Sequence, residues 1–156
     1  SNLNLKQLDI NFLIETCYRE HKHLAEAKKL DYDIKIDETS PFCKTDEELL
    51  KTAVSHIMHN AIKYTDEGKI EIKVESDKNN VYISVLDTGI GIKEESLKDI
   101  FEPFVQESIG LSRKYEGTGI GLSLAKRYIE ILGGNIIAKS KPGKGTEFII
   151  LIPKSL

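Results

Sequence analysis

The sequence predicts a two-layer α/β sandwich, in which helices pack on one face of a mixed, mostly antiparallel sheet. Three observations support this prediction: two long segments have apolar residues at helical spacing, two alternating runs flank a short polar turn, and two more alternating runs close the chain. The predicted order α-β-α-β-β-α-β-β suits a sheet with its helices segregated to one side. A chain of 156 residues can bury a core, so we expect residues 1–156 to form a single domain.

The composition argues against several classes of protein. Hydrophobic residues make up 40% and charged residues 30% of the chain, as in soluble globular proteins. The formal net charge of -3 favours neither nucleic acid nor an anionic membrane as a partner. No apolar run approaches the roughly 18 residues that span a bilayer, and no signal peptide is visible. We expect a cytoplasmic domain with no nucleic-acid partner, and leave open whether the full-length protein has a membrane anchor.

The first 45 residues predict one helix and one strand. Residues 9–30 carry apolar side chains at helical spacing, which indicates an amphipathic helix. Residues 32–37 alternate and indicate a short strand. Pro41 and Phe42 interrupt the pattern, so we expect a loop there.

The strongest predicted helix covers residues 46–65, at the start of the part of the chain, 46–153, that carries the chemically informative motifs. Acidic residues favour its N-terminus, and its apolar residues recur along one face. Residues 69–76 and 80–87 alternate on either side of a polar turn, which predicts an antiparallel hairpin.

The second half of the chain predicts two more helices and two more strands. A short helix is expected near 93–100 and a longer one over about 121–133, where Gly133 and Gly134 end it. Two strands, "NIIAKS" and "TEFIILI", flank the turn "KPGKG". Residues 105–118 have no clear period, and a loop of this length in a compact domain is usually functional.

Two glycine-rich segments raise the question of nucleotide binding. In residues 117–121 ("GTGIG"), alternate glycines open a predicted helix, where free backbone N–H groups and a partial positive charge suit phosphate. In the segment "DTGIGI", Asp87 precedes Gly89 and Gly91. These glycines could make a tight turn or let a ligand approach the bare backbone. A flexible loop is the simpler alternative for residues 117–121.

His56, Asn60 and Lys63 share one face of the predicted helix, because they are spaced four and three residues apart. An Asn amide oxygen can join a Mg²⁺ shell, and a Lys ammonium supplies a point charge for phosphate. A solvated helix face is the ordinary explanation for a single Asn and a single Lys. No cluster of Cys and His accompanies His56 to make a zinc site.

Five motifs together resemble a known family. "HNAIKYT", "DTGIGI", "FEPF", "GTGIGLSLAKRYIEILGG" and "GKGTEF" occur in this order, and they resemble the ATP-binding catalytic domain of sensor histidine kinases. That family has the Bergerat fold, which gyrase-type and mismatch-repair ATPases share. The resemblance covers roughly residues 46–153. Any one motif alone is a weak signal, whereas five in order are specific.

The resemblance implies a role for each motif. Asp87 would accept a hydrogen bond from the adenine amino group, with support from Thr146, while Gly89 and Gly91 would let the base approach the backbone. Asn60 would be the protein ligand of Mg²⁺. The remaining residues of the ATP site would be Lys63, Tyr64, Ile92, Phe104, Lys114, Gly117, Thr118, Gly119, Gly121 and Leu122.

The resemblance also implies a mobile ATP lid over residues 105–118, with Phe101 and Phe104 at its base. Arg113 or Lys114 of that lid would reach the terminal phosphate. The catalytic residues would then be His56, Asn60, Lys63 and Arg113.

Two departures from the family pattern matter. Position 56 is commonly Asn in these kinases and Glu in the related ATPases, and here it is His56. No stretch resembles the phosphoacceptor box, in which an acidic residue follows the substrate His, so we expect the phosphoacceptor helical domain to be absent from this chain.

The expected function is that of the catalytic domain of a two-component sensor histidine kinase, which transfers the γ-phosphoryl group of Mg-ATP to a His. Its expected partners are the dimerisation and phosphoacceptor domain of the same protein, with the full-length protein a homodimer, and a downstream response regulator. An ATP-hydrolysing conformational-switch ATPase is one alternative. A degenerate nucleotide-binding interaction module is the other.

Overall fold

Helices and strands are interspersed along the chain in the computed structural model, which describes residues 2–102 and 121–156. The elements are β1 (Leu5–Asp9), α1 (Ile10–Ala27), β2 (Asp31–Lys35), β3 (Phe42–Asp46), α2 (Glu47–Lys63), β4 (Lys69–Ser76), β5 (Asn80–Asp87), α3 (Glu94–Leu97), α4 (Gly121–Ile131), β6 (Asn135–Lys141) and β7 (Gly145–Pro153).

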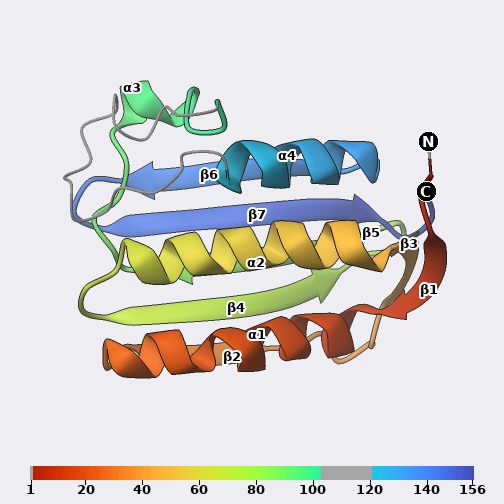
Figure 1. Cartoon of the computed structure of the whole chain (residues 1–156), viewed down its shortest axis with the longest axis horizontal. Helices are drawn as coiled ribbons and strands as arrows, with labels where there is room; N and C mark the ends of the chain where they lie inside the picture. Colours follow the sequence, from red (N-terminus) through yellow and green to blue (C-terminus); the bar gives the residue numbers. More distant parts are fainter. Residues whose placement is uncertain (1, 103–120) are drawn as a thin grey trace.

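The main sheet has the strand order β2-β4-β5-β7-β6. β2 pairs with β4 in parallel, whereas the other neighbours in this sheet are antiparallel. Figure 1 shows α1, α2 and α4 side by side across one face of the sheet, and α2 contacts both α1 and α4. The predicted two-layer α/β sandwich with a mixed, mostly antiparallel sheet is confirmed.

A second sheet corrects the sequence-based expectation for the first 46 residues. In it β1 pairs with β3, from Leu5 opposite Asp46 to Asp9 opposite Phe42. The predicted loop therefore ends at Pro41, and the prediction that Phe42 belongs to it is wrong. Four of the five residues of β1 are exposed, so this strand lacks the apolar alternation that marks a half-buried strand in a sequence.

The core lies between the main sheet and the helices. The buried stripe of α2 has the predicted helical spacing, and each of its Leu, Val, Ile and Met side chains contributes roughly 1.5–3 kcal/mol of burial free energy. The stripe consists of Leu50, Ala53, Val54, Ile57, Met58, Ala61 and Ile62, and it packs in one cluster with Ile70, Ile72, Val81, Ile83, Val85 and Ile150 of the sheet.

Within the described ranges, no helix is both long enough and apolar enough to cross a bilayer.

The C-terminal end of α2 is held by Lys28, which follows α1. Its ammonium donates to the carbonyl oxygens of Ile62 at 2.8 Å and of Lys63 and Thr65 at 3.0 Å, and it lies 3.6 Å from the Asp66 carboxylate. The last carbonyls of a helix lack partners within the helix, and a positive charge is favourable there. Lys28 therefore fixes the end of α2 against α1.

Candidate nucleotide-binding site

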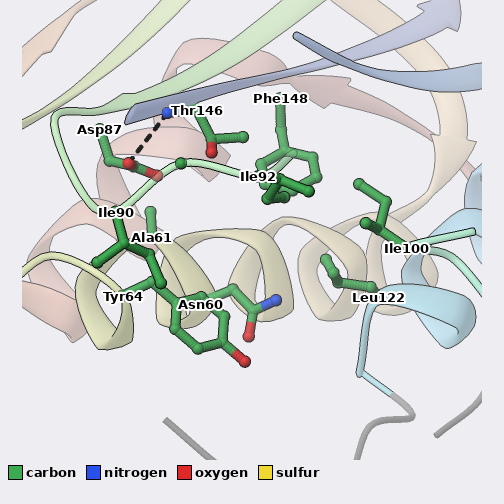
Figure 2. A pocket seen from close by; sticks show the side chains of 11 residues that line it. Asn60, Ala61, Tyr64, Asp87, Ile90, Ile92, Ile100, Leu122, Thr146 and Phe148 are labelled. Carbon is green, nitrogen blue, oxygen red and sulfur yellow. Dashed lines mark hydrogen bonds between the residues drawn. The ribbon is translucent and has the colours of Figure 1, made fainter. Parts of the chain in front are cut away.

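A pocket opens between the C-terminal half of α2, the segment after β5, the start of α4 and strand β7. Its empty volume, open mouth included, is about 450 Å³, and Figure 2 shows side chains from these separate elements meeting around one space. An apolar pocket with few polar groups is typical of small-molecule sites. The lining residues are Asn60, Ala61, Tyr64, Asp87, Ile90, Gly91, Ile92, Ile100, Leu122, Thr146 and Phe148.

The carboxylate of this pocket belongs to Asp87, which ends β5 and is only 4% exposed. Its Oδ1 accepts hydrogen bonds from the backbone N–H of Gly89 at 2.9 Å and of Thr146 at 3.2 Å, the second drawn in Figure 2. Burial raises the pKa of the Asp87 carboxyl to about 6, although the two N–H donors act in the opposite direction. Within the described residues both bonds end on Oδ1, so Oδ2 is left for a donor on a ligand.

The segment after Asp87 is hydrogen-bonded to the structure on both of its sides. On one side the N–H of Ile90 donates to the carbonyl of Tyr64 at 3.2 Å. On the other side the carbonyl of Ile90 accepts from the N–H of Gly143 at 2.8 Å, and the N–H of Ile92 donates to the Ser140 hydroxyl at 2.8 Å. This wall of the pocket is therefore fixed to α2 and to the β6–β7 hairpin at once.

The two glycines of this segment are explained by the protein's own packing. A Cβ atom on Gly89 would lie 2.4 Å from the carbonyl oxygen of Tyr64, and one on Gly91 would lie 2.0 Å from the carbonyl oxygen of Lys141. Gly91 also has a φ of +73°, which side chains rarely adopt. Only glycine fits at either position, whether or not a ligand approaches the backbone there.

His56, Asn60 and Lys63, which were predicted to share one face of α2, do not all line the pocket. Asn60 lines the pocket, together with Tyr64, the residue after the helix. The Lys63 ammonium lies 5.6 Å from the centroid of the Tyr64 ring, on a side chain that is not among the lining residues. The His56 ring packs against the first residue of α4, because a Cβ atom on Gly121 would lie 3.2 Å from its Nδ1.

Burial shifts the pKa values of His56, Lys63 and Tyr64. It lowers the pKa of His56, so the imidazole is neutral at pH 7. It also lowers the pKa of Lys63. Burial raises the pKa of the Tyr64 hydroxyl to about 12, which keeps that hydroxyl protonated.

The structure brings four more of the predicted residues to the same pocket. These lining residues are Gly91, Ile92, Leu122 and Thr146. The backbone N–H of Gly89 donates a hydrogen bond to Asp87. The predicted lid and several predicted phosphate-site residues lie outside the described ranges, namely Phe104, Arg113, Lys114, Gly117, Thr118 and Gly119.

Sequence reasoning missed four apolar lining residues and one polar support. Ala61, Ile90, Ile100 and Phe148 complete the walls of the pocket. Their residue types alone are ordinary for a core. Only their position could have indicated them, because Ala61, Ile90 and Phe148 lie within the motifs "HNAIKYT", "DTGIGI" and "GKGTEF", and Ile100 directly precedes "FEPF". The support is Ser140, which no motif includes.

The fold and this pocket define a nucleotide-binding domain of the Bergerat type. Residues 45–156 match the family described as histidine kinase-, DNA gyrase B- and HSP90-like ATPase, and the chain belongs to this family. The relatives and solved structures below identify it, within the family, as an ATP-binding catalytic domain of the histidine kinase type.

Two curated relatives illustrate the sequence likeness. The sensor histidine kinase RcsC of Escherichia coli K12 is 38% identical over 104 residues, which cover 67% of this chain and 11% of RcsC. The hybrid signal transduction histidine kinase B of Dictyostelium discoideum is 39% identical over 155 residues, which cover 96% of this chain and 8% of that protein. The chain thus corresponds to a small part of each relative.

Three solved structures have the same fold. The catalytic domain of histidine kinase ThkA in a nucleotide-free form has a TM-score of 0.83 at 28% identity, with 98% of this chain and 97% of that one covered. Full-length ShkA in complex with AMPPNP has a TM-score of 0.87 at 27% identity, covering 98% of this chain and 32% of ShkA. ThkA in complex with the response regulator TrrA has a TM-score of 0.80 at 29% identity, covering 96% and 42%.

Proposed function

We propose that this domain binds Mg-ATP in the pocket around Asp87 and transfers the γ-phosphoryl group to a histidine on a separate dimerisation and phosphoacceptor domain of the same protein. The observation that carries the proposal is the buried Asp87 carboxylate: two backbone N–H groups donate to one oxygen, and the other has no donor among the described residues and would accept from the ligand. The parent protein would be a cytoplasmic or membrane-anchored homodimer that phosphorylates a response regulator. The AMPPNP complex of ShkA and the response-regulator complex of ThkA support these assignments by analogy.

The adenine base would occupy the part of the pocket beside Asp87. Its exocyclic amino group can donate to Oδ2 of Asp87, and a hydrogen bond to a charged acceptor is worth about 1.5–3 kcal/mol. Ile90, Ile92 and Phe148 provide apolar surface for the flat ring on the same walls. The base is therefore the part of the nucleotide that the described residues recognise best.

The phosphates would lie toward Asn60 and the start of α4. Within residues 2–102 and 121–156, no three His, Cys, Asp or Glu side chains gather to hold a metal ion. Mg²⁺ does not need such a cluster, because it usually keeps several waters and is bound by substrate phosphates with one or two protein ligands. Asn60 is the pocket residue whose amide oxygen can serve as such a ligand.

The reaction requires little covalent chemistry from this domain. A ring nitrogen of the acceptor histidine forms a bond to the γ-phosphorus, the bond from that phosphorus to the β–γ bridging oxygen breaks, and ADP leaves with the electron pair. Bound Mg²⁺ would supply charge neutralisation on the phosphates. The role of Asp87, Asn60 and Lys63 would be to bind and orient the nucleotide.

His56 would hydrogen-bond a phosphate or a metal-bound water, as the Asn common at this position in kinases would. Its imidazole is neutral at pH 7 and packs against the start of α4. A neutral imidazole could also activate water, which is the role of Glu in the related ATPases. We favour the first role, because a kinase gains nothing from hydrolysing ATP.

The test supplies the phosphoacceptor domain of the same protein as a separate polypeptide, with Mg²⁺ and γ-labelled ATP. We expect acid-labile label on that domain, in an amount that depends on this chain, and none on this chain alone. Label on His21 or His23 of this chain would contradict the proposal. ATP hydrolysis without transfer would favour the conformational-switch ATPase, and nucleotide binding without either reaction would favour the interaction module.

A further inference from the structure

A groove between α1 and α2 lies apart from the nucleotide pocket and contains two histidines. His59 of α2 lines this groove together with Leu24 of α1, and the empty volume of the groove, open mouth included, is about 890 Å³. His21 is three residues before Leu24, so it lies on the same face of α1. His59 is exposed and His21 is half-buried, so both imidazoles can meet a solute.

Two contacts show that α1 and α2 run side by side in the same direction (Figure 1). The Glu20 carboxylate lies 3.2 Å from the Lys51 ammonium in the first part of α2. Further along both elements, the Lys28 ammonium donates to the Ile62 carbonyl at 2.8 Å. A step toward the C-terminus of one helix is therefore matched by a step in the same direction along the other.

This register places the two histidines opposite each other. The side chains of Cys17 on α1 and Ser55 on α2 share a hydrogen bond across the helix interface. His21 follows Cys17 by four residues, and His59 follows Ser55 by four residues. Each step is one turn on the same face, about 6 Å along its own helix. The two imidazoles therefore face each other one turn beyond the hydrogen-bonded pair.

A hydrogen bond fixes the tautomer of the neutral His21 ring. Its Nδ1 lies 2.8 Å from the Cys17 carbonyl oxygen. Because a carbonyl can only accept, Nδ1 carries the proton and Nε2 has a free lone pair. Metal-binding histidines have this arrangement, in which one ring nitrogen donates to a carbonyl and the other binds the ion.

His59 also offers a lone pair. Burial lowers the pKa of its imidazole, and the neighbouring His21, Lys63 and His56 act in the same direction, so the ring is neutral at pH 7. Lys63 also lines the groove, and its positive charge repels cations. A cation would therefore have to bind here through its affinity for imidazole nitrogen rather than through charge, which favours transition metals over Mg²⁺ or Ca²⁺.

We propose that His21 and His59 form a site for a divalent transition-metal ion of the Zn²⁺ or Cu²⁺ class, which joins α1 to α2. Among residues 2–102 and 121–156 no third His, Cys, Asp or Glu side chain joins this pair, so water fills the remaining coordination positions. Neither histidine lines the pocket around Asp87. The inference therefore does not rest on the proposed nucleotide-binding function.

The experiment is a calorimetric titration of the nucleotide-free chain with Zn²⁺ at neutral pH, using wild type, His21→Gln, His59→Gln and His23→Gln. Loss even of an outer partner of a metal ligand costs about 10–100-fold in affinity, so loss of either ligand should weaken Zn²⁺ binding at least about tenfold. His23 is the matched control, because it is exposed on α1 and lies two residues from His21, on another face. Its variant should bind Zn²⁺ as wild type does, and Mg²⁺ should not replace Zn²⁺.

NMR of the imidazole nitrogens of wild type tests the same site without a substitution. Before Zn²⁺ is added, His21 should carry its proton on Nδ1. Zn²⁺ should then shift the ring signals of His21 and His59 and leave those of His23 in place. This measurement decides the matter if a variant does not fold.

Three results would overturn the inference. The first is no Zn²⁺ binding by wild type, and the second is an unchanged affinity in His21→Gln. The third is a loss of binding in His56→Asn that His21→Gln does not show, since it would assign the ion to His56 and His59 on α2 alone.

Discussion

Gly89 packs so closely against Tyr64 that a Cβ atom on Gly89 would lie 2.4 Å from the Tyr64 carbonyl oxygen. The same carbonyl accepts the N–H of Ile90 at 3.2 Å. The end of α2 and the segment after β5 therefore form one unit, with Asp87 and Tyr64 on the same pocket. The position of the carboxylate depends on this close contact.

Substitution of Gly89 should separate these two elements. A Cβ atom in Gly89→Ala would also lie 2.7 Å from the Thr65 hydroxyl, and overpacking of this kind costs about 1–3 kcal/mol. We expect a lower free energy of unfolding in urea and weaker ADP binding. Gly143→Asn is the control, because nothing lies within 4 Å of a Cβ there and Asn tolerates its φ of +75°. Equal stability of the two variants would contradict the close contact.

Lys28 should stabilise the domain through the end of α2. Its ammonium donates to the carbonyls of Ile62, Lys63 and Thr65, and Lys28→Met keeps the aliphatic stem while removing all three bonds. Because the side chain is partly exposed, we expect a loss of about 1–3 kcal/mol in the free energy of unfolding.

Lys51→Met is the matched control for Lys28→Met. Lys51 also links α2 to α1, through an ion pair of 3.2 Å with Glu20, in which the Lys51 side chain is 38% exposed and that of Glu20 is 50% exposed. Such pairs contribute roughly 0–1 kcal/mol. Chemical denaturation that finds the two variants equally stable would show that the carbonyl contacts of Lys28 add nothing.

Much of the fold and part of the site could be predicted from the sequence. Residues 69–76 and 80–87 alternate, and residues 46–65 have apolar side chains at helical spacing. These patterns are visible in the sequence because each element must turn one apolar face toward the core. The weak strand β1 could not be found, because its side chains are mostly exposed and its partner β3 lies far along the chain.

Some residues of the candidate site could also be predicted from the sequence, and others could not. Asp87 and Thr146 could be named from short motifs, and the structure places them on one pocket. Ile100 and Phe148 reach that pocket only through the packing of distant elements, and their residue types carry no chemical signal. The role of Ser140 depends on side-chain geometry across the β6–β7 hairpin, which no sequence period encodes.

Adenosine binding should weaken in acid. Burial raises the pKa of Asp87 to about 6, so below that pH the carboxyl carries a proton and its O–H opposes the adenine amino group. The affinity should fall by up to about tenfold per pH unit below 6. Adenosine is the ligand to titrate because it has no phosphate to change charge in this range, and NMR can follow the binding.

A control variant separates Asp87 from other groups in this titration. In Asp87→Asn the dependence on pH should disappear. The raised pKa affects folding in the opposite direction to binding. Between about pH 6 and the ordinary carboxyl range, the folded state binds a proton that the unfolded state does not bind, so Asp87 stabilises the fold more as the pH falls. An adenosine affinity that does not change between pH 7 and pH 5 would contradict the ionised acceptor.

Substitutions of His56 distinguish a positioning role from a base. If His56 hydrogen-bonds a phosphate or a metal-bound water, His56→Asn should keep phosphotransfer and His56→Ala should reduce it. Basal ATP hydrolysis should stay low in wild type and in both variants. Brisk hydrolysis by wild type that His56→Asn abolishes would identify His56 as a base and would favour the ATPase alternative.

The most direct measurement is calorimetric titration of wild type and Asp87→Asn with Mg-ADP. In the proposed function the buried Asp87 carboxylate recognises the adenine amino group. Loss of a hydrogen bond to a charged acceptor costs about 1.5–3 kcal/mol, which corresponds to roughly tenfold or more in affinity. We predict that wild type binds Mg-ADP and that Asp87→Asn binds it at least about tenfold more weakly. Equal affinities of the two proteins would contradict the account.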